Sequence, residues 1–392
     1  MTNTNPFRPG SGISPPYFAG RNREIDIFRK KLDKSMNDDF IQHMAIVSGW
    51  GSGKTSLLLK FKEIARGINC PVLPVQLYSV MDTKDFVELF VNSASFVVPP
   101  SKWKKFSSAV SSLGINVMGT GVQVVKQASF FEPQTAFCHS LKNIWNNSHT
   151  QLIPVMIDDI QLITKKEQTL EILRNVFTWA ANEGYKFMLV VSGTLDLFER
   201  FQEAHSPLTR FFEPLILNPL SSDEIRDAVL KPLENTSISF SDDVVEQIIT
   251  LSEGNPFYIQ LLASHAFEHA RNNIVNLDDF KLSLISAIND VSARMFDNMF
   301  NKLCMNEKNV LRILYESDVP MRWGEVLEMA ENSGIKRASA RTSLKRLIDN
   351  ELLKSVKPQK YEKQYTLRDV LFKEYLSAKL DKVSKVSKVS KV

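Results

Sequence analysis

The sequence predicts an α/β fold of three layers, in which helices cover both faces of a parallel sheet, followed by a helical lid and a winged helix-turn-helix domain. Two observations predict this architecture. Between residues 20 and 220, short apolar runs such as Met44–Val47 and Leu152–Ile157 alternate with longer segments of helical periodicity, which is typical of a buried parallel sheet. From about residue 221 to residue 290 the periodicity is helical only. The segment 291–378 is then predicted to contain three helices followed by two short strands.

Composition and cysteine spacing favour an ordinary soluble protein in a reducing compartment. Of the 392 residues, 43% are hydrophobic and 23% are charged, which is close to the average of globular proteins. Cys70, Cys138 and Cys304 lie far apart and form no C-x-x-C pair, which argues against a disulfide framework or a zinc site. Residues 1–20 contain no apolar signal-peptide region, and no apolar run approaches the roughly 18 residues of a membrane span. We therefore expect a cytoplasmic protein with no membrane partner.

The net charge says little about partners, because it is concentrated at one end of the chain. The formal charge is +4 at pH 7, and residues 379–392 hold five lysines against Asp381. The rest of the chain is therefore formally neutral, so any nucleic-acid surface has to be a local basic patch. The same residues repeat Lys-Val-Ser, a regular and polar pattern from which we expect a disordered tail.

Changes in pattern divide the chain into segments. We expect an extended lead-in over 1–20, an α/β domain over 21–220, a lid over 221–290, a winged helix over 291–378 and the tail over 379–392. Within the α/β domain, Pro99-Pro100 and several glycines mark 97–132 as an insertion, which we expect to form a small hairpin. Ser221 is followed three positions later by Glu224, which predicts a capping box at the first lid helix.

The strongest motif lies between the first apolar strand and the helix that follows it. It reads Ser48-Gly49-Trp50-Gly51-Ser52-Gly53-Lys54-Thr55. Glycines let backbone N–H groups turn inward around a chain of phosphates, and the start of the following helix adds its positive dipole end. Lys54 would reach the β- and γ-phosphates of ATP, and the Thr55 hydroxyl would bind Mg²⁺. The expected nucleotide contacts are Gly49, Gly51, Ser52, Gly53, Lys54, Thr55 and Ser56.

Two adjacent acids end a later strand. The run Leu152–Ile157 is followed by Asp158 and Asp159, and carboxylates at the end of a buried strand need a partner or a function. Asp158 fits the acid that holds Mg²⁺, and Asp159 fits the residue that polarises the attacking water. Taken alone, the pair also fits an ordinary cap of a turn. Its position about a hundred residues after the phosphate-binding loop, with room for a strand and helices between them, favours the catalytic interpretation.

Further motifs resemble those of AAA+ and STAND ATPases, especially archaeal-type ATPases and origin-recognition-like replication initiators that carry a C-terminal winged helix. Phe18-Ala19-Gly20-Arg21-Asn22-Arg23-Glu24 resembles the Phe-x-Gly-Arg-x-x-Glu box of these proteins, which implies that Phe18 and Arg21 lie against the adenine base. Ser192, in Ser192-Gly193-Thr194, is similar to a residue that senses the γ-phosphate. The resemblance covers residues 15–376 and implies an ATPase that uses ATP and Mg²⁺ and releases ADP.

The chain departs from that pattern at several positions. Ser48 stands where the strict loop has glycine, and Gly49 can serve instead. Asp159 replaces the glutamate of many AAA+ enzymes, so we expect slow turnover. The lid turn Gly254-Asn255-Pro256 resembles the Gly-x-Pro motif of STAND proteins and carries no sensor arginine.

Arg210 lies just before the fifth expected strand, where the resemblance implies an arginine finger. An ion pair with Glu199 or Glu213 is the alternative role of this side chain. A finger that acts in trans requires a homo-oligomer or a partner protein, which the sequence does not show.

The C-terminal segment presents a basic surface. Helices are expected over 306–317, 323–332 and 337–350, and two strands flank a polar wing. Lysine and arginine neutralise phosphates, and arginine also reaches base edges in the major groove. The basic residues expected to contact double-stranded DNA are Lys336, Arg337, Arg341, Lys345 and Arg346 near the third helix and Lys357 and Lys360 on the wing. Protein docking stays open as an alternative, because exposed helix faces are normally charged.

These inferences favour an ATPase that couples its nucleotide state to DNA binding. ATP would set the angle between the lid and the winged helix, and hydrolysis would reset it. Two alternatives use the same site: a STAND-like signalling or defence ATPase whose winged helix docks on the core, and an ATPase that regulates a mobile element. His265 and His269 lie four positions apart on an expected helix, but we expect no metal there because no third ligand is apparent.

Overall fold

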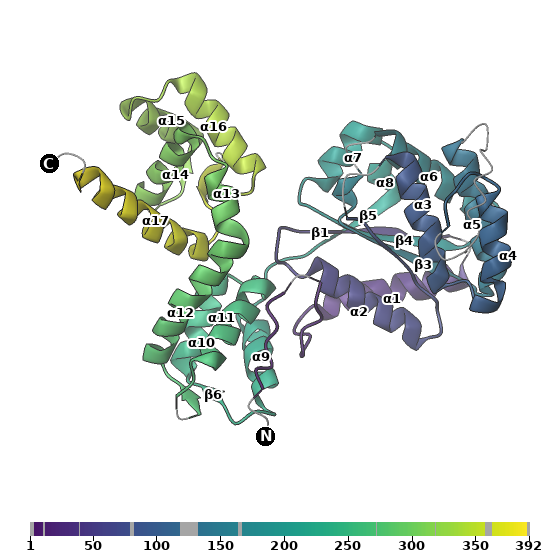
Figure 1. The fold of residues 1–392 in the computed structure, drawn as a ribbon, viewed down its shortest axis with the longest axis horizontal. Helices are drawn as coiled ribbons and strands as arrows, with labels where there is room; N and C mark the ends of the chain where they lie inside the picture. The colour runs from purple at the N-terminus through teal and green to yellow at the C-terminus, as the bar shows by residue number, and fades with distance from the viewer. Residues whose placement is uncertain are drawn as a thin grey trace. The chain divides into compact units, whose positions relative to one another are not determined.

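The structure is a computed structural model that describes residues 4–10, 12–38, 40–78, 82–117, 132–163, 167–271, 273–317, 319–356 and 363–389. The chain divides into two units, and Figure 1 labels many of their helices and strands. One unit is Gly10–Pro219, and the other combines Leu220–Val392 with Met1–Pro9. The first nine residues therefore belong with the second half of the chain.

A five-stranded parallel sheet forms the centre of the Gly10–Pro219 unit. Its strands lie in the order β2-β3-β4-β1-β5. They are β1 (His43–Val47), β2 (Leu73–Gln76), β3 (Ile153–Asp158), β4 (Phe187–Gly193) and β5 (Phe212–Ile216). Every pairing is parallel, and β4 lies between β1 and β3. Because the carboxyl ends of parallel strands lie on the same side of the sheet, the residues that follow β1, β3 and β4 meet there.

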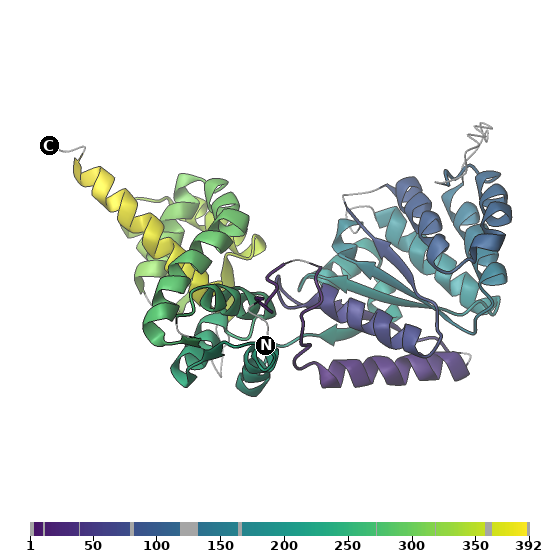
Figure 2. The ribbon, with the colours of Figure 1, turned by 60° about the horizontal axis from the view of Figure 1, so that its bottom comes forward.

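Helices cover both faces of this sheet, which confirms the predicted three layers. Met44 and Ile46 of β1 pack with helices on one face, and Ala45 and Val47 pack with those on the other. Figure 2 shows the purple α1 and α2 on one side of the sheet and blue helices on the other. The core on the first face includes residues of α1 (Asn22–Asn37) and α2 (Lys54–Gly67). The core on the second face includes residues of α3 (Thr83–Ser93), α4 (Pro100–Ser111), α5 (Pro133–Ser148), α6 (Glu167–Asn182), α7 (Leu197–His205) and α8 (Leu208–Phe211).

The described part of the segment 97–132 contains a helix, whereas most of the predicted hairpin lies outside the described residues. This helix is α4, which begins at Pro100 and buries Phe106 and Val110. Proline suits the first turn of a helix, where its missing N–H has no intrahelical acceptor, so the Pro99-Pro100 pair starts a helix here. Residues 118–131, which include most of the glycines that suggested a hairpin, lie outside the described residues.

The lid begins at the predicted capping box. Ser221 Oγ accepts a hydrogen bond from the Glu224 backbone N–H at 3.3 Å, and the Glu224 carboxylate accepts one from the Ser221 N–H at 2.8 Å. The lid helices are α9 (Ser222–Leu233), α10 (Asp242–Ser252), α11 (Pro256–Glu268) and α12 (Leu277–Val291), and a π-helical turn (Ser292–Phe296) and α13 (Asp297–Asn301) follow them. Two strands of two residues each, β6 (Ser239–Phe240) and β7 (Ile274–Val275), pair in parallel. The sequence did not predict them, because two residues leave no periodic signal.

The elements that follow include three helices and then two strands in the predicted order, together with a short strand and a last helix that the sequence did not predict. They are α14 (Met305–Ser317), β8 (Met321–Arg322), α15 (Trp323–Asn332), α16 (Arg337–Asp349), β9 (Leu353–Val356), β10 (Gln364–Leu367) and α17 (Val370–Val389). The three strands form an antiparallel sheet in the order β8-β10-β9. We call α14 to α17 the C-terminal module.

The end of the chain differs from the disordered tail expected over 379–392. In the structure, α17 continues to Val389. The Lys-Val-Ser repeat contains no glycine or proline that would end a helix, so the helix can extend through it. Among the described residues, no helix combines the length and the apolar character that crossing a membrane requires.

Polar contacts join the lid to the C-terminal module. Tyr258 Oη of α11 donates to Asp369 Oδ2 at 2.8 Å, and Arg368 Nε donates to the same oxygen at 2.7 Å. Burial and the nearby Asp369 carboxylate raise the pKa of Tyr258, so its hydroxyl keeps the proton that it donates. Lys354 of β9 also pairs with Glu253 of the lid at 2.9 Å. Lid and module thus belong to one unit, and the nucleotide-dependent angle between them stays a prediction.

A buried histidine at the start of β1 makes folding sensitive to acid. The His43 ring lies 4.3 Å from that of Phe211 between ring centroids, and its Nδ1 accepts a hydrogen bond from the Leu189 N–H at 3.0 Å. Burial lowers the pKa of His43 from 6.5 to about 3. The unfolded chain therefore binds a proton at this residue below pH 6.5, where the folded protein does not.

Stability is expected to fall as the pH drops from 6.5 towards 3, because protonation of His43 then favours the unfolded chain. Between pH 7 and pH 4.5 we expect this residue to lower the free energy of unfolding by about 3 kcal/mol. Urea denaturation of the wild type and of His43→Asn at both pH values measures this loss. The asparagine oxygen can accept the same hydrogen bond without titrating, so an equally steep pH dependence in both proteins would contradict the assignment.

Candidate functional site

The loop between β1 and α2 brings together the residues predicted to bind phosphate. Gly51 and Gly53 have φ angles of 76° and 88°, which residues with a side chain adopt only with strain, so both positions require glycine. Lys54 is the first residue of α2, and its Nζ donates to the carbonyl oxygens of Ser48 at 3.0 Å and Gly49 at 2.9 Å. The Lys54 ammonium is therefore held over the loop.

Asp158, the acid that ends β3, forms hydrogen bonds with Thr55 of α2 and Ser192 of β4. Thr55 Oγ1 donates to Asp158 Oδ2 at 2.7 Å, and Ser192 Oγ of β4 donates to the other oxygen of the same carboxylate. The strand order explains this grouping, because β4 separates β1 from β3 and places Ser192 between them. Three residues that the sequence predicted separately thus form one hydrogen-bonded group.

Asp159, the second acid, has a left-handed backbone conformation with φ 54°. Its N–H donates to Ser192 Oγ at 3.0 Å, and its Oδ1 accepts a hydrogen bond from Gln161 Nε2 at 2.8 Å. The backbone bond ties Asp159 to the same serine that holds Asp158. The sequence did not predict the contact with Gln161, and a polar side chain two positions after the acid was the only signal for it.

Thr55 and Asp158 also fit a magnesium ion. A hydroxyl and a carboxylate are the hard oxygen ligands that Mg²⁺ prefers, and proteins commonly bind this ion through one or two such groups together with substrate phosphates. The two oxygens lie 2.7 Å apart at the start of α2. Within the described residues, no group of three His, Cys, Asp or Glu side chains offers another metal site.

Arg21 supports the phosphate-binding loop from the side of the lead-in. Its guanidinium donates to the Ser52 carbonyl oxygen at 3.2 Å and to the Asn218 carbonyl oxygen at 2.6 Å, and only 7% of the residue is exposed. These contacts link the loop to the residues that follow β5. Phe18 is half-buried against the core that α1 and α2 share with the sheet. That Phe18 and Arg21 contact an adenine stays a prediction.

Arg210 lies at the amino ends of the strands, whereas the loop lies at their carboxyl ends. It precedes Phe212, the first residue of β5, which pairs with His43, the first residue of β1. The five residues of β1, about 16 Å at 3.3 Å per residue, therefore separate this end of the sheet from the loop. As an arginine finger, Arg210 would therefore act on the site of another chain, in a homo-oligomer or a partner protein, and this role stays a prediction.

The alternative role of Arg210 as an ion-pair partner is not seen. Glu213 instead pairs with the buried Lys31. Across the described parts of the chain, no ion pair joins Arg210 to Glu213 or Glu199. The Arg210 side chain is exposed.

The predicted DNA-contacting residues differ in how their charges are used. Arg337 pairs with Glu331 at 2.6 Å, and Arg346 lies 3.6 Å from the buried Glu307, so part of their charge is neutralised. The predicted positions that are exposed and form no ion pair within the described residues are Lys336, Arg341 and Lys345. Lys357 and Lys360 of the predicted wing lie outside the described residues.

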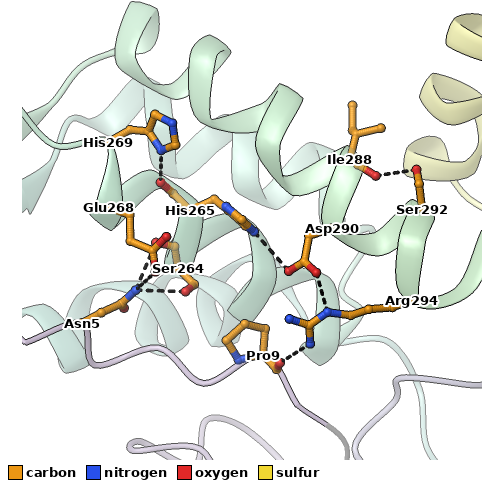
Figure 3. Close-up of polar contacts among 10 residues, drawn as sticks. All are labelled: Asn5, Pro9, Ser264, His265, Glu268, His269, Ile288, Asp290, Ser292 and Arg294. Carbon is orange, nitrogen blue, oxygen red and sulfur yellow. Dashed lines mark hydrogen bonds and ion pairs between the residues drawn. The ribbon is translucent and has the colours of Figure 1, made fainter.

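The two lid histidines have separate partners, as Figure 3 shows. His265 Nε2 lies 3.3 Å from Asp290 Oδ2. His269 Nδ1 lies 2.9 Å from the backbone oxygen of His265, one turn earlier in the same helix. Their imidazole nitrogens therefore do not face a common point.

Comparisons with solved structures show which known folds this chain resembles. No family model matches the chain, and no curated protein matches it. Among solved structures, the ORC2 protein of Aeropyrum pernix in its ADPNP-ADP complexes aligns with a TM-score of 0.64 and 14% identity, covering 97% of this chain and 98% of that one. A Walker-type ATPase of Pyrococcus abyssi gives a TM-score of 0.62 and 13% identity over 92% and 96% of the two chains.

Drosophila ORC, solved bound to DNA, gives a TM-score of 0.50 and 13% identity over 93% of this chain and 88% of that one. These identities are low, so the likeness concerns the fold and not the activity. The alignments extend over nearly the whole chain, through both units. The chain therefore has the fold that archaeal Walker-type ATPases share with ORC proteins, as its motifs implied.

Proposed function

We propose that this chain binds ATP with Mg²⁺, hydrolyses it slowly, and uses its nucleotide state to control DNA binding by the C-terminal module. One observation carries the proposal: Thr55, Asp158 and Ser192 form a hydrogen-bonded group beside the loop over which Lys54 is held. The named neighbours support it, because one is a Walker-type ATPase and another was solved with ADPNP and ADP.

Each residue of the site has a distinct task in this proposal. The loop N–H groups and the Lys54 ammonium bind the phosphates, as in other loops at helix starts. Thr55 and Asp158 hold Mg²⁺, which lowers the charge repulsion around the phosphates. Asp159 orients the attacking water and accepts its proton, and Ser192 fixes both acids through its hydroxyl.

The C-terminal module supplies the surface for double-stranded DNA. Lys336, Arg341 and Lys345 project from the start and the exposed side of α16, and cationic side chains there suit a phosphate backbone. Drosophila ORC was solved bound to DNA, which supports a similar use of this fold. In this proposal the nucleotide state acts on this surface through the lid, to which the module is joined within one unit.

Removing two of these charges is expected to weaken DNA binding and its dependence on salt. Each lost phosphate contact lowers the slope of log affinity against log salt by about 0.9, so Arg341→Ala with Lys345→Ala should lower it by about 2. Fluorescence anisotropy with a labelled duplex, at several salt concentrations, measures this slope. Lys104→Ala with Lys105→Ala removes the same charge from exposed positions on α4 and is the matched control. Equal effects of both pairs would place the DNA contact elsewhere.

The same assay with and without ATP tests the proposal as a whole. We expect the affinity for DNA to change when ATP is added to the wild type, and to stay constant in a Lys54→Ala variant at the same ATP concentration, because that variant binds ATP much more weakly. A wild type that binds ATP but no DNA at low salt would contradict DNA binding and favour the alternative in which the module docks on a protein.

A further inference from the structure

The N-terminal residues are anchored on the lid. Asn5 Nδ2 donates to the backbone oxygen of Ser264 at 3.2 Å, to its hydroxyl at 3.0 Å and to Glu268 Oε1 at 3.1 Å (Figure 3). The Phe7 side chain is buried with 4% exposed, and its ring centroid lies 6.1 Å from that of Phe240 and 6.5 Å from that of Phe267. A polar anchor and an apolar anchor thus hold this segment on α11.

Backbone contacts continue the attachment. The Arg8 N–H donates to Gln260 Oε1 at 3.0 Å. The Pro9 carbonyl accepts a hydrogen bond from Arg294 at 3.0 Å, and Arg294 is itself held by Asp290 of α12 (Figure 3). These contacts extend the attachment from α11 to the end of α12. They all lie within the unit that contains the C-terminal module.

A few residues later, the same segment touches the start of the phosphate-binding helix. Ser56 Oγ donates to the Ile13 carbonyl oxygen at 3.2 Å. Gly12 has a φ of +71°, and an atom at its Cβ position would lie 3.8 Å from Thr55 Cγ2. Thr55 is the residue that also binds Asp158. These contacts lie within the Gly10–Pro219 unit, so one short segment is attached to both units.

We propose that residues 5–13 form a strap that positions the first turn of α2 and transmits its state to the lid and the C-terminal module. All of these residues except 11 are described. Four peptide steps lead from Pro9 to Ile13, which span at most about 14 Å when fully extended, so a short stretch of chain joins the two sets of contacts. Gly12 and Ile13 are positioning residues for Thr55 and Ser56, and Asn5 and Phe7 are the anchors. This inference rests on the proposed function, because it needs a nucleotide at α2.

Lengthening the strap tests the proposal and leaves both sets of contacts in place. A flexible insertion of six Gly and Ser residues between Pro9 and Gly10 adds about 13 Å of root-mean-square length. The same insertion after Gly184, in an exposed turn before β4, is the matched control. Fluorescent ATP titration measures affinity, and hydrogen exchange of α11 and α12 with and without ATP measures transmission.

In the wild type and in the Gly184 insertion, ATP is expected to slow exchange in α11 and α12. The strap insertion should retain ATP affinity within about threefold and lose more than about half of that slowing. An undiminished response in the strap insertion would overturn the strap, as would a wild type that binds ATP with no response. A wild type that binds no ATP would instead overturn the proposed function.

If the insertion disturbs folding, a substitution tests the strap instead. Phe7→Ala removes the apolar anchor, whereas Arg8→Ala removes only a side chain that is exposed and keeps the backbone contact with Gln260. Circular dichroism establishes that both variants are folded. We expect Phe7→Ala to lose the response of α11 and α12 to ATP and Arg8→Ala to keep it, and equal responses would overturn the strap.

Discussion

Lys54→Ala is expected to lower the affinity for ATP by about 30- to 4,000-fold, because truncating one partner of a buried charge pair costs about 2–5 kcal/mol. The reason lies in the position of the ammonium. Its two hydrogen bonds hold it over the loop, beside glycines whose backbone conformations direct the chain around that point. Alanine leaves the loop and the start of α2 in place but removes the positive charge that polyphosphate requires.

A matched lysine in the same helix separates this effect from a general loss of charge. Lys60 lies in α2 and pairs with Glu63 at 3.0 Å, away from the loop. Titration with a fluorescent ATP analogue is expected to give nearly the wild-type affinity for Lys60→Ala. Unchanged affinity in Lys54→Ala would mean that ATP does not bind at this loop, and the proposed function would fail with it.

The sequence predicted the layers, and it singled out residues that the structure groups beside the loop, because their signals are local. Met44–Val47 alternates its side chains between two cores, and a fully buried strand of this kind appears as an unbroken apolar run. Glycines at positive φ, a lysine that opens a helix and two acids that end a strand are likewise recognised over a few residues.

The features that escaped prediction depend on contacts between distant residues. Ser192 meets Asp158 only because β4 lies between β1 and β3, an order that no single segment encodes. The pairing of β5 with β1 puts Arg210 at the end of the sheet away from the loop, which its sequence position before β5 does not reveal. Phe7 lies in a polar lead-in and is buried by residues more than 200 positions away. Sequence periodicity carries no information about such partners.

Ion pairs within the module also distinguish the basic residues that were predicted to contact DNA. The sequence predicted five cationic positions near α16 as equivalent DNA contacts. The structure divides them, because Glu331 and Glu307 pair with Arg337 and Arg346. Both acids come from other helices of the module, so the third helix alone could not reveal them.

Asp159→Asn is expected to separate ATP binding from hydrolysis. Loss of a general base typically costs about 10²- to 10⁴-fold in rate, so kcat should fall by that factor while ATP affinity stays within about threefold of the wild type. Asparagine is suited to this test because it tolerates the left-handed conformation of residue 159, where φ is 54°. Its oxygen can still accept the hydrogen bond from Gln161 Nε2, so only the charge is removed.

An acid with the same backbone conformation provides the control. Glu351 has φ 55° and lies in the C-terminal module, outside the group around Asp158. Single-turnover phosphate release is expected to be normal in Glu351→Gln and to be nearly abolished in Asp159→Asn, which should retain bound ATP. Undiminished hydrolysis in Asp159→Asn would remove this residue from the reaction, even though its N–H binds the same serine as Asp158. The catalytic assignment depends on the Asp159 carboxylate, because the backbone contact survives the substitution.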